Sequence, residues 1–448
     1  MKHSKGVDLM RRKANVLRTV SCLIAISLFA TVFFAGCGGS ESTSTATSTS
    51  YTEELPSPDP QPDEEPEDKI PEPEEKSEIK WRYTVTGPDT AVLTGYNEAS
   101  GVTPSGGVKI PEKIDGYTIT GIQAKAFYKN TELVSVAIPA TVKIIEDSAF
   151  EECTSLRRVE TSNGLEAIGA RAFAECCYLE SIQFPNTLKR IGANAFLYCA
   201  LPSVELPQEL TTLEEKAFSG CFLESVTLPQ SLTTWGESVF SGCDELKSVI
   251  IPETISVIPN GTFAGCSSLE DVTMNGVTSI GDNAFQRCSL KHIVLPKTLK
   301  SIGENAFAGC RFTSIEVPEG VTSLVGTFAE CTELSDVKLP STLLSLSGTF
   351  KNCYRLRKVV IPNGTASLAH AFDGCENLNQ IYLPASLNVM SELFEDSIRL
   401  YDIYYGGSEA EWKTLQQLND LNASSTPPRN PTLQNATIHY NASPSNMI

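Results

Sequence analysis

The chain has 448 residues, of which 41% are hydrophobic and 20% charged, so it carries enough apolar material for a large core or a long repeat array. Its formal net charge is −19. Nucleic acids require clustered Lys and Arg on their partners, and so do anionic lipid surfaces. This composition therefore excludes nucleic acid as a partner and gives the chain no general attraction to an anionic membrane surface.

The first 36 residues are basic and then apolar, unlike the rest of the chain. They contain six Lys and Arg residues against one Asp. An apolar run from Val20 to Gly36 follows the basic stretch, which is the arrangement of an export signal. A run of 17 residues is also long enough for a short transmembrane anchor, so the run itself leaves both interpretations open.

The apolar run ends in the sequence Phe34-Ala35-Gly36-Cys37, which resembles the lipobox of bacterial lipoproteins, although Phe34 stands where Leu is usual. In that family the Cys thiol is lipidated and becomes the mature N-terminus. The resemblance implies a signal peptide over residues 1–36 and a lipid on Cys37. The membrane is then a partner through this lipid, because each buried methylene adds about 0.8 kcal/mol of membrane affinity. It places the protein outside the cytoplasm, on the bacterial cell envelope.

Residues 38–78 are rich first in Ser and Thr and then in Pro, Asp and Glu. Such a segment cannot bury enough apolar surface to offset its ordering entropy. Proline favours an extended conformation and like charges repel, so we predict that residues 37–79 form a disordered, stretched tether that begins at the lipidated Cys.

A motif built around phenylalanine recurs every 21 to 23 residues through the rest of the chain, which indicates a solenoid. The thirteen aromatic residues that keep this spacing are Phe127, Phe150, Phe173, Phe196, Phe218, Phe240, Phe263, Phe285, Phe307, Phe328, Phe350, Phe372 and Phe394. Each unit exposes an apolar face that only its neighbours can cover. Stacking of the units at about 4.8 Å would therefore place the phenylalanines in one buried column.

The unit from Ser289 to Cys310 shows how one rung would fold. Alternating apolar residues in "HIVLP" predict a strand over 292–296, which ends where proline cannot donate a backbone hydrogen bond. A second short extended segment follows, and Gly303 permits a bend. We predict that "ENAFAGC" then forms one helical or 3₁₀ turn, with Phe307 directed into the core.

The repeat pattern LxxIxLPxxLxxIGxxAFxxC resembles that of the BspA-like leucine-rich repeats of bacterial surface proteins. The resemblance implies a β-rich leucine-rich-repeat solenoid, in which parallel strands stack in a superhelix that is capped at both ends. It implies an N-terminal β cap over 80–107, about 13 repeats of 21–23 residues over 108–402, and a C-terminal cap and tail over 403–448. It also implies surface display and adhesion to proteins or glycans.

Eleven cysteines share one position of the repeat: Cys153, Cys176, Cys199, Cys221, Cys243, Cys266, Cys288, Cys310, Cys331, Cys353 and Cys375. With no CxxC pair and four histidines in the chain, the spacing speaks against a metal site. Disulfides remain open, since stacked Cα atoms lie within bridging range. Unbridged packed thiols are favoured, because stacking aims all thiols the same way and because Asn130 and Ser397 replace Cys in the end repeats. For the additional Cys177 we predict solvent exposure.

The sequence contains no GxSxG, GxxxxGK[ST] or HExxH motif, so we expect a non-enzymatic binding protein that needs no cofactor and no metal. Strand alternation places Val360, Tyr382 and Tyr404 outward on adjacent rungs, and we predict that this stripe binds an extracellular protein or polysaccharide. Alternatively, the tail of residues 416–430 folds back and covers these residues. Two other functions stay open: a structural envelope protein without a host ligand, and a glycan-capture protein that serves a transporter.

Overall fold

The structure is a computed structural model, which describes residues 70–391, 393–422 and 436–447. Cys37, the predicted signal peptide and most of the predicted tether lie outside these residues. The chain divides after Pro71, and the architecture concerns the unit from Glu72 to Ile448. Among the described residues, none of the helices is both long enough and apolar enough to cross a bilayer.

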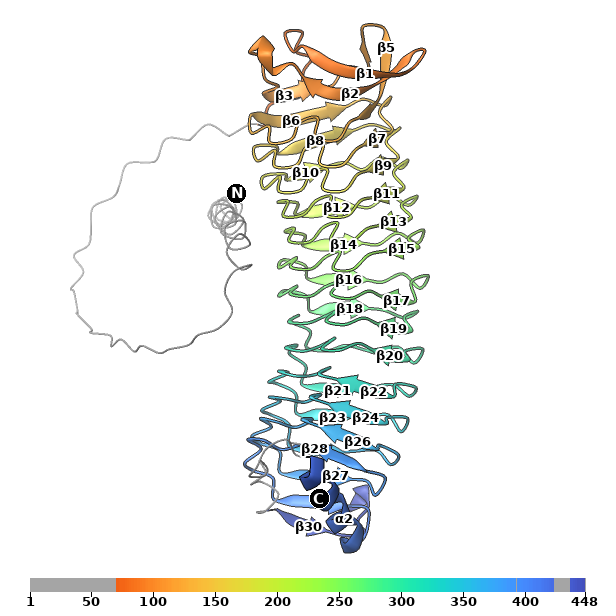
Figure 1. The fold of residues 1–448 in the computed structure, drawn as a ribbon, viewed down its shortest axis with the longest axis vertical. Coiled ribbons are helices and arrows are strands. Elements are labelled where there is room, and N and C mark those ends of the chain that lie inside the picture. Colours follow the sequence, from red (N-terminus) through yellow and green to blue (C-terminus); the bar gives the residue numbers. More distant parts are fainter. Residues whose placement is uncertain (1–69, 392, 423–435, 448) are drawn as a thin grey trace, which may run out of the picture. The chain divides into compact units, whose positions relative to one another are not determined.

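The repeats form a parallel β-solenoid, as predicted. Each rung contributes up to two short strands, and the strands of successive rungs pair in parallel to give two ladders, which Figure 1 shows side by side along the unit. The first ladder contains β3 (Gly106–Lys109), β6 (Leu133–Ile138), β8 (Arg158–Thr161), β10 (Ser181–Ile182), β12 (Ser203–Glu205), β14 (Ser225–Thr227), β16 (Ser248–Ile250), β18 (Asp271–Thr273), β21 (Ser314–Glu316), β23 (Asp336–Lys338), β25 (Lys358–Val360), β27 (Gln380–Leu383) and β29 (Asp402–Tyr405).

The second ladder follows the turn after the first strand of each rung, and most of these turns contain a proline. It contains β5 (Tyr117–Ile122), β7 (Ile144–Ile145), β9 (Ala167–Ile168), β11 (Arg190–Ile191), β13 (Thr212–Leu213), β15 (Thr234–Trp235), β17 (Val257–Ile258), β19 (Ser279–Ile280), β20 (Ser301–Ile302), β22 (Ser323–Val325), β24 (Ser345–Ser347), β26 (Ser367–Ala369) and β28 (Val389–Ser391). The register places like residues above one another, so that Ile168, for example, pairs with Ile145 and Ile191.

Strand pairing is not continuous along either ladder: it breaks between β10 and β12 and between β23 and β25 in the first, and between β15 and β17 and between β20 and β22 in the second. The first ladder also breaks between β18 and β21, where the sequence predicts a strand over 292–296. This segment is not a strand in the structure. Leu295 is nevertheless buried as predicted, and Val294 is exposed. The rung therefore keeps its apolar alternation without pairing with its neighbours.

The thirteen phenylalanines form one continuous buried column. Neighbouring rings lie 4.8 to 6.0 Å apart between centroids, and their planes differ by 2° to 21°. Full burial of one such side chain contributes roughly 1.5–3 kcal/mol. The column is consequently a principal part of the core that joins the rungs.

The corner that presents each phenylalanine is not the helical turn that the sequence predicts. Around Phe127, hydrogen bonds between residues three apart do occur, as in a 3₁₀ turn. However, Lys125 and Lys129 adopt a left-handed backbone with φ of 62° and 60°, so a helix cannot continue through them. The N–H of Phe127 itself donates to the carbonyl of Ala149 in the next rung, at 2.7 Å. The corner thus adds a third line of hydrogen bonds between rungs.

Gly303 is required by close packing rather than by a bend. A Cβ atom at this position would lie 2.4 Å from the backbone nitrogen of Asp282 in the preceding rung. The equivalent Gly281 would meet the backbone nitrogen of Asn260 at 2.6 Å. The glycine in the Ile-Gly pair therefore lets successive rungs approach closely.

The cysteines of the repeat are reduced and buried, as predicted. Each of the eleven thiols donates a hydrogen bond to a phenylalanine carbonyl of the preceding rung, at 3.1 to 3.3 Å. Ser397 makes the same bond to the Phe372 carbonyl at 2.7 Å. The prediction that Cys177 faces solvent is wrong, because this residue is buried and the adjacent Tyr178 takes the exposed position.

Additional elements cover both ends of the stack. At the N-terminal end, β1 (Trp81–Gly87) and β2 (Thr90–Tyr96) form an antiparallel hairpin, and β2 pairs in parallel with β5, which also pairs with β4 (Lys113–Ile114). The rings of Trp81 and Tyr96 both lie 6.2 Å from Phe127. The short 3₁₀ helix η1 (Glu98–Ser100) follows this hairpin.

At the C-terminal end, β30 (Thr437–His439) pairs with β29, and the 3₁₀ helix η2 (Pro444–Asn446) follows. Helix α2 (Glu409–Asn422) buries Trp412 against the Tyr405 ring, with centroids 5.0 Å apart. The Ser408 hydroxyl accepts from the Glu411 N–H, and the Glu411 carboxylate accepts from the Ser408 N–H, which caps the start of α2.

Candidate functional site

The predicted stripe of Val360, Tyr382 and Tyr404 lies on adjacent rungs, as the register of β25, β27 and β29 requires. The two tyrosines are nevertheless buried, with exposed fractions of 4% and 8%, whereas Val360 is 41% exposed. The prediction that the two tyrosines are exposed is therefore wrong, and the predicted binding role depended on their exposure.

The burial of the tyrosines has an identifiable cause in the C-terminal cap. The Tyr404 ring stacks on His439 of β30, with centroids 4.6 Å apart and planes within 15°. The Tyr382 hydroxyl donates to the Asn363 side chain at 3.1 Å, and burial raises the pKa of this phenol. The element that covers Tyr404 is thus β30 and not the tail of residues 416–430 that the alternative prediction named.

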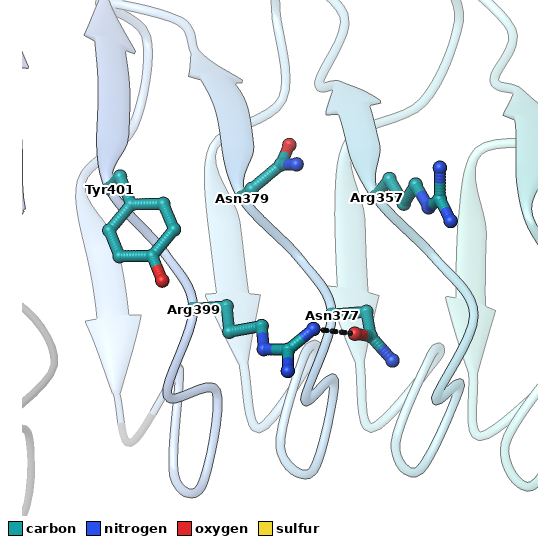
Figure 2. Close-up of a pocket in the computed structure, with 5 residues that line it drawn as sticks. All are labelled: Arg357, Asn377, Asn379, Arg399 and Tyr401. Atoms are coloured by element: carbon teal, nitrogen blue, oxygen red, sulfur yellow. Dashed lines mark hydrogen bonds between the residues drawn. The ribbon is translucent and has the colours of Figure 1, made fainter.

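An open pocket of about 370 Å³ lies on the same rungs, close to the predicted stripe (Figure 2). Its lining consists of Arg357, Asn377, Asn379, Arg399 and Tyr401. Three of these residues occupy one equivalent position, immediately before β25, β27 and β29, and the other two lie two residues earlier in their rungs. None of these five residues was predicted as a site residue from the sequence.

Strand alternation explains why these side chains point outward. Leu356, Leu378 and Leu400 are buried in three successive rungs. Each lies between two outward positions, one on either side, and these outward positions supply the pocket residues. Tyr401 is the most exposed aromatic side chain of the group, at 59%.

In earlier rungs, the residues at the position equivalent to Arg357 form ion pairs between neighbouring rungs. Lys247 contacts Glu224 at 3.0 Å, and Lys291 contacts Glu270 at 2.9 Å. In the rung before that of Arg357, the equivalent residue is Ser335. In the two rungs after it, the equivalent residues are Asn379 and Tyr401 of the pocket. Within the described part of the chain, the Arg357 guanidinium and the Tyr401 hydroxyl make no side-chain hydrogen bond or ion pair, so both are available to a ligand.

The other polar groups of the pocket are held in place. Figure 2 shows that Arg399 Nη1 donates to Asn377 Oδ1, at 2.8 Å. In turn, Asn377 Nδ2 donates to the Tyr354 carbonyl at 2.6 Å. The Asn379 Oδ1 atom is buried and accepts no hydrogen bond from the residues that the structure describes. The pocket thus combines two guanidinium groups, two amides and a phenol.

A second pocket, of about 330 Å³, lies against β8 and is lined by Arg158, Glu160 and Gln183 among others. Its arginine is already neutralised, because Arg158 contacts Glu72 at 2.8 Å and Glu160 at 3.2 Å. The C-terminal pocket is therefore the better candidate. Over the described ranges, no group of three or more His, Cys, Asp or Glu residues is arranged to hold a metal ion.

Comparison with protein families gives a match over most of the solenoid. Six copies of a repeat described as a BspA type leucine rich repeat region match residues 120–200, 189–311 and 300–414. Together these ranges cover more than half of the chain. A comparison with curated proteins found no match.

Several solved structures are similar to this chain. A leucine-rich repeat protein from Bacteroides ovatus is 25% identical over 81% of this chain and 98% of its own, with a TM-score of 0.65. The pneumococcal vaccine antigen PcpA is 23% identical over 77% of this chain and 89% of its own, with a TM-score of 0.51. A leucine-rich cell surface protein from Faecalibacterium prausnitzii is 23% identical over 75% of this chain and 96% of its own, with a TM-score of 0.44.

Proposed function

Because the chain belongs to the BspA-type leucine-rich repeat family, we propose that it is a non-enzymatic, lipid-anchored binding protein of the adhesin type. It is displayed on the bacterial cell surface, and it holds an extracellular protein or polysaccharide in the pocket of Arg357, Asn377, Asn379, Arg399 and Tyr401. A solenoid of stacked repeats offers long side-chain surfaces, which suits binding more than catalysis.

The proposal is supported by a change in the pairing of charged side chains along the outer surface of the first ladder. In the middle rungs, acidic and basic side chains pair between neighbours, as in Glu224 with Lys247. In the last rungs, an unpaired guanidinium and an exposed tyrosine share one open pocket. Arg and Tyr are the residue types that most often dominate binding energy at interfaces.

The anchoring part of the proposal depends on the sequence around Cys37. A Cys37→Ala variant tests it by detergent partitioning and by mass spectrometry of the N-terminal peptide. The native protein should enter the detergent phase with a lipid on Cys37, and the variant should stay in the aqueous phase. A variant that still carries lipid would refute the anchor while leaving the binding proposal unaffected.

The binding part is tested by presenting the full chain to immobilised matrix proteins, mucins and polysaccharides. We expect a Tyr401→Ala variant to lose about tenfold or more in affinity for the ligand that binds. An Arg311→Gln variant is the matched control, because Arg311 is an exposed arginine of the same array outside the pocket. Binding that is equally strong in the Tyr401 variant would move the site elsewhere. The absence of any ligand would favour a structural envelope protein.

A further inference from the structure

We propose that the ligand of this pocket is an acidic polysaccharide, a sugar chain that carries carboxylate or sulfate groups at regular intervals. This inference rests on the proposed function, since it names the class of ligand that the same pocket takes. It follows from the charge of the lining, the spacing of that charge, and the chemistry of the groups between the charges.

The positive charge of the pocket is not cancelled by neighbouring acids. Neither Arg357 nor Arg399 forms an ion pair with a carboxylate of the described residues, whereas Arg171 contacts Glu151 at 2.6 Å and Arg190 contacts Glu214 at 2.7 Å. The acid next to Tyr401 in the sequence, Asp402, is instead engaged by other groups.

Asp402 is contacted by His439 Nε2 at 2.9 Å and by the Gln380 side chain at 3.4 Å. Its charge is therefore directed toward the C-terminal strand rather than toward the guanidinium groups. In a chain with a net charge of −19, two arginines that share one pocket and have no carboxylate partner among the described residues favour an anionic ligand.

The two guanidinium groups are presented at a fixed interval along the solenoid. Arg357 and Arg399 belong to rungs that are two steps apart, so their backbones are separated by roughly 10 Å along the stack, at about 4.8 Å per rung. A polymer with one acidic group on every second sugar offers negative charges at a comparable repeat. A single small anion would use only one of the two arginines.

The groups between the arginines suit a sugar more than a protein surface. The Asn377 and Asn379 amides offer donors and acceptors of the kind that hydroxyl groups need. The exposed ring of Tyr401 provides a flat apolar face beside them, against which a sugar ring can stack.

The same features make an acidic peptide a poorer occupant. Extended peptides bind by adding to a free strand edge, but β27 is paired with β25 on one side and with β29 on the other, and β29 is also paired with β30. Peptide side chains also seek apolar pockets, and the pocket lining includes no aliphatic side chain. A peptide would therefore gain charge contacts and little else.

The inference is tested by calorimetric titration of the full chain with four polymers: hyaluronan, chondroitin sulfate, neutral dextran and poly-L-glutamate. We expect hyaluronan or chondroitin sulfate to bind, dextran not to bind, and poly-L-glutamate to bind more weakly. Binding should weaken when the salt concentration rises from about 0.05 M to 0.5 M, because salt screens exposed charges.

Three variants separate the roles within the pocket. Arg357→Gln and Arg399→Gln should each lower the affinity for the acidic polysaccharide about tenfold, whereas the Arg311→Gln control should leave it unchanged. Tyr401→Ala should lower polysaccharide affinity by a similar factor but leave the weak poly-L-glutamate binding unchanged. Melting temperatures of all variants establish that the fold is intact.

Several results would overturn the inference. Equal binding of dextran and hyaluronan would mean that the charges do not select the ligand. Preferential binding of poly-L-glutamate would make the partner an acidic protein. If none of the four polymers binds but a matrix protein does so in a Tyr401-dependent manner, the polysaccharide inference fails while the proposed binding function stands.

Discussion

Each corner from Phe127 to Phe372 contains two residues with a left-handed backbone, placed two residues before and two residues after the phenylalanine. Around Phe307 these are Asn305, with φ of 54°, and Gly309, with φ of 74°. Asparagine and glycine tolerate this conformation better than other residues. The recurrent letters of "NAFAG" therefore reflect backbone geometry as well as packing.

The two glycines of this rung should respond differently to substitution. Gly309→Ala should destabilise the protein by about 1–2 kcal/mol, the cost of a left-handed L-residue. Gly303→Ala should cost more, because its Cβ would lie 2.4 Å from the backbone of Asp282 and the rungs would have to separate. Urea denaturation of the two variants, followed by circular dichroism, measures the difference. Equal losses would mean that the stack accommodates the methyl group without separation.

The two neighbouring tyrosines of the last rung should have opposite roles. Tyr404→Ala removes a buried ring that stacks on His439 and should cost about 3 kcal/mol of stability or more. Tyr401→Ala removes a mostly exposed ring and should change stability by less than about 0.5 kcal/mol while it weakens ligand binding. Thermal melting and a binding titration of the same two variants check both statements. A large loss of stability in the Tyr401 variant would assign that residue to the cap.

At the scale of an element, the thiol column links stability to alkaline pH. Burial raises the pKa of these thiols above the ordinary value of 9.0, to about 12 for Cys153, Cys331 and Cys375. The other thiols of the column whose pKa is raised by burial are Cys176, Cys243, Cys266, Cys288, Cys310 and Cys353. The folded state therefore keeps protons that the unfolded state releases.

Because the folded pKa is the higher one, this stabilisation is complete below pH 9 and is lost as the pH rises toward 12. Each thiol contributes a slope of up to about 1.4 kcal/mol per pH unit. Because nine such groups titrate in the same pH range, stability should fall steeply, and we expect unfolding as the pH rises from 9 toward 12. Circular dichroism at constant temperature and increasing pH measures this transition.

A serine variant provides the control, because Ser397 already makes the equivalent hydrogen bond in the last repeat. Replacing Cys266, Cys288 and Cys310 together by serine should make the alkaline transition less steep. An unchanged steepness would show that other groups, such as buried tyrosines, cause the transition.

At the scale of the whole repeat array, each rung contacts only its neighbours, so damage to a cap should remain local. Trp412→Ala leaves a cavity beside Tyr405 and should destabilise the C-terminal rungs by about 3–5 kcal/mol. Hydrogen exchange should then become faster in β25, β27 and β29 and stay unchanged in β8. Uniformly faster exchange along the chain would mean that the rungs unfold as one cooperative unit.

The periodic parts of this architecture were predictable, because the same pattern of residues recurs in every repeat. Phe307 and Cys310 occur in a context that recurs along the chain, so their column and their burial follow from the period alone. The left-handed corners were missed although their letters repeat, because a short compact segment with apolar residues also fits a helical turn. The unpaired segment 292–296 was missed because its alternation matches that of its paired neighbours.

The non-periodic contacts were not predictable in the same way. His439 lies 35 residues after Tyr404 and belongs to no repeat, so nothing in the period indicates that its ring covers the tyrosine. The pocket around Arg357 depends on which charges lack a partner in adjacent rungs. The missing partner of Arg357 becomes apparent only when Ser335 and Asn379 are aligned with it in the adjacent rungs. The site predicted from the sequence lay at another outward position, that of Val360, Tyr382 and Tyr404.

The hydrogen bonds that join rung to rung run along the stack, as the bond from Phe127 to Ala149 does in the corner. This direction has a mechanical consequence for a protein held at its N-terminal end and loaded at its C-terminal pocket, because tension would pull the rungs apart in the direction of these bonds. Since only neighbouring rungs are joined, they would detach one at a time. Each released rung of about 22 residues would add roughly 70 Å of chain. If the chain has the binding function proposed above, it would lengthen under tension and dissipate the force before the ligand dissociates.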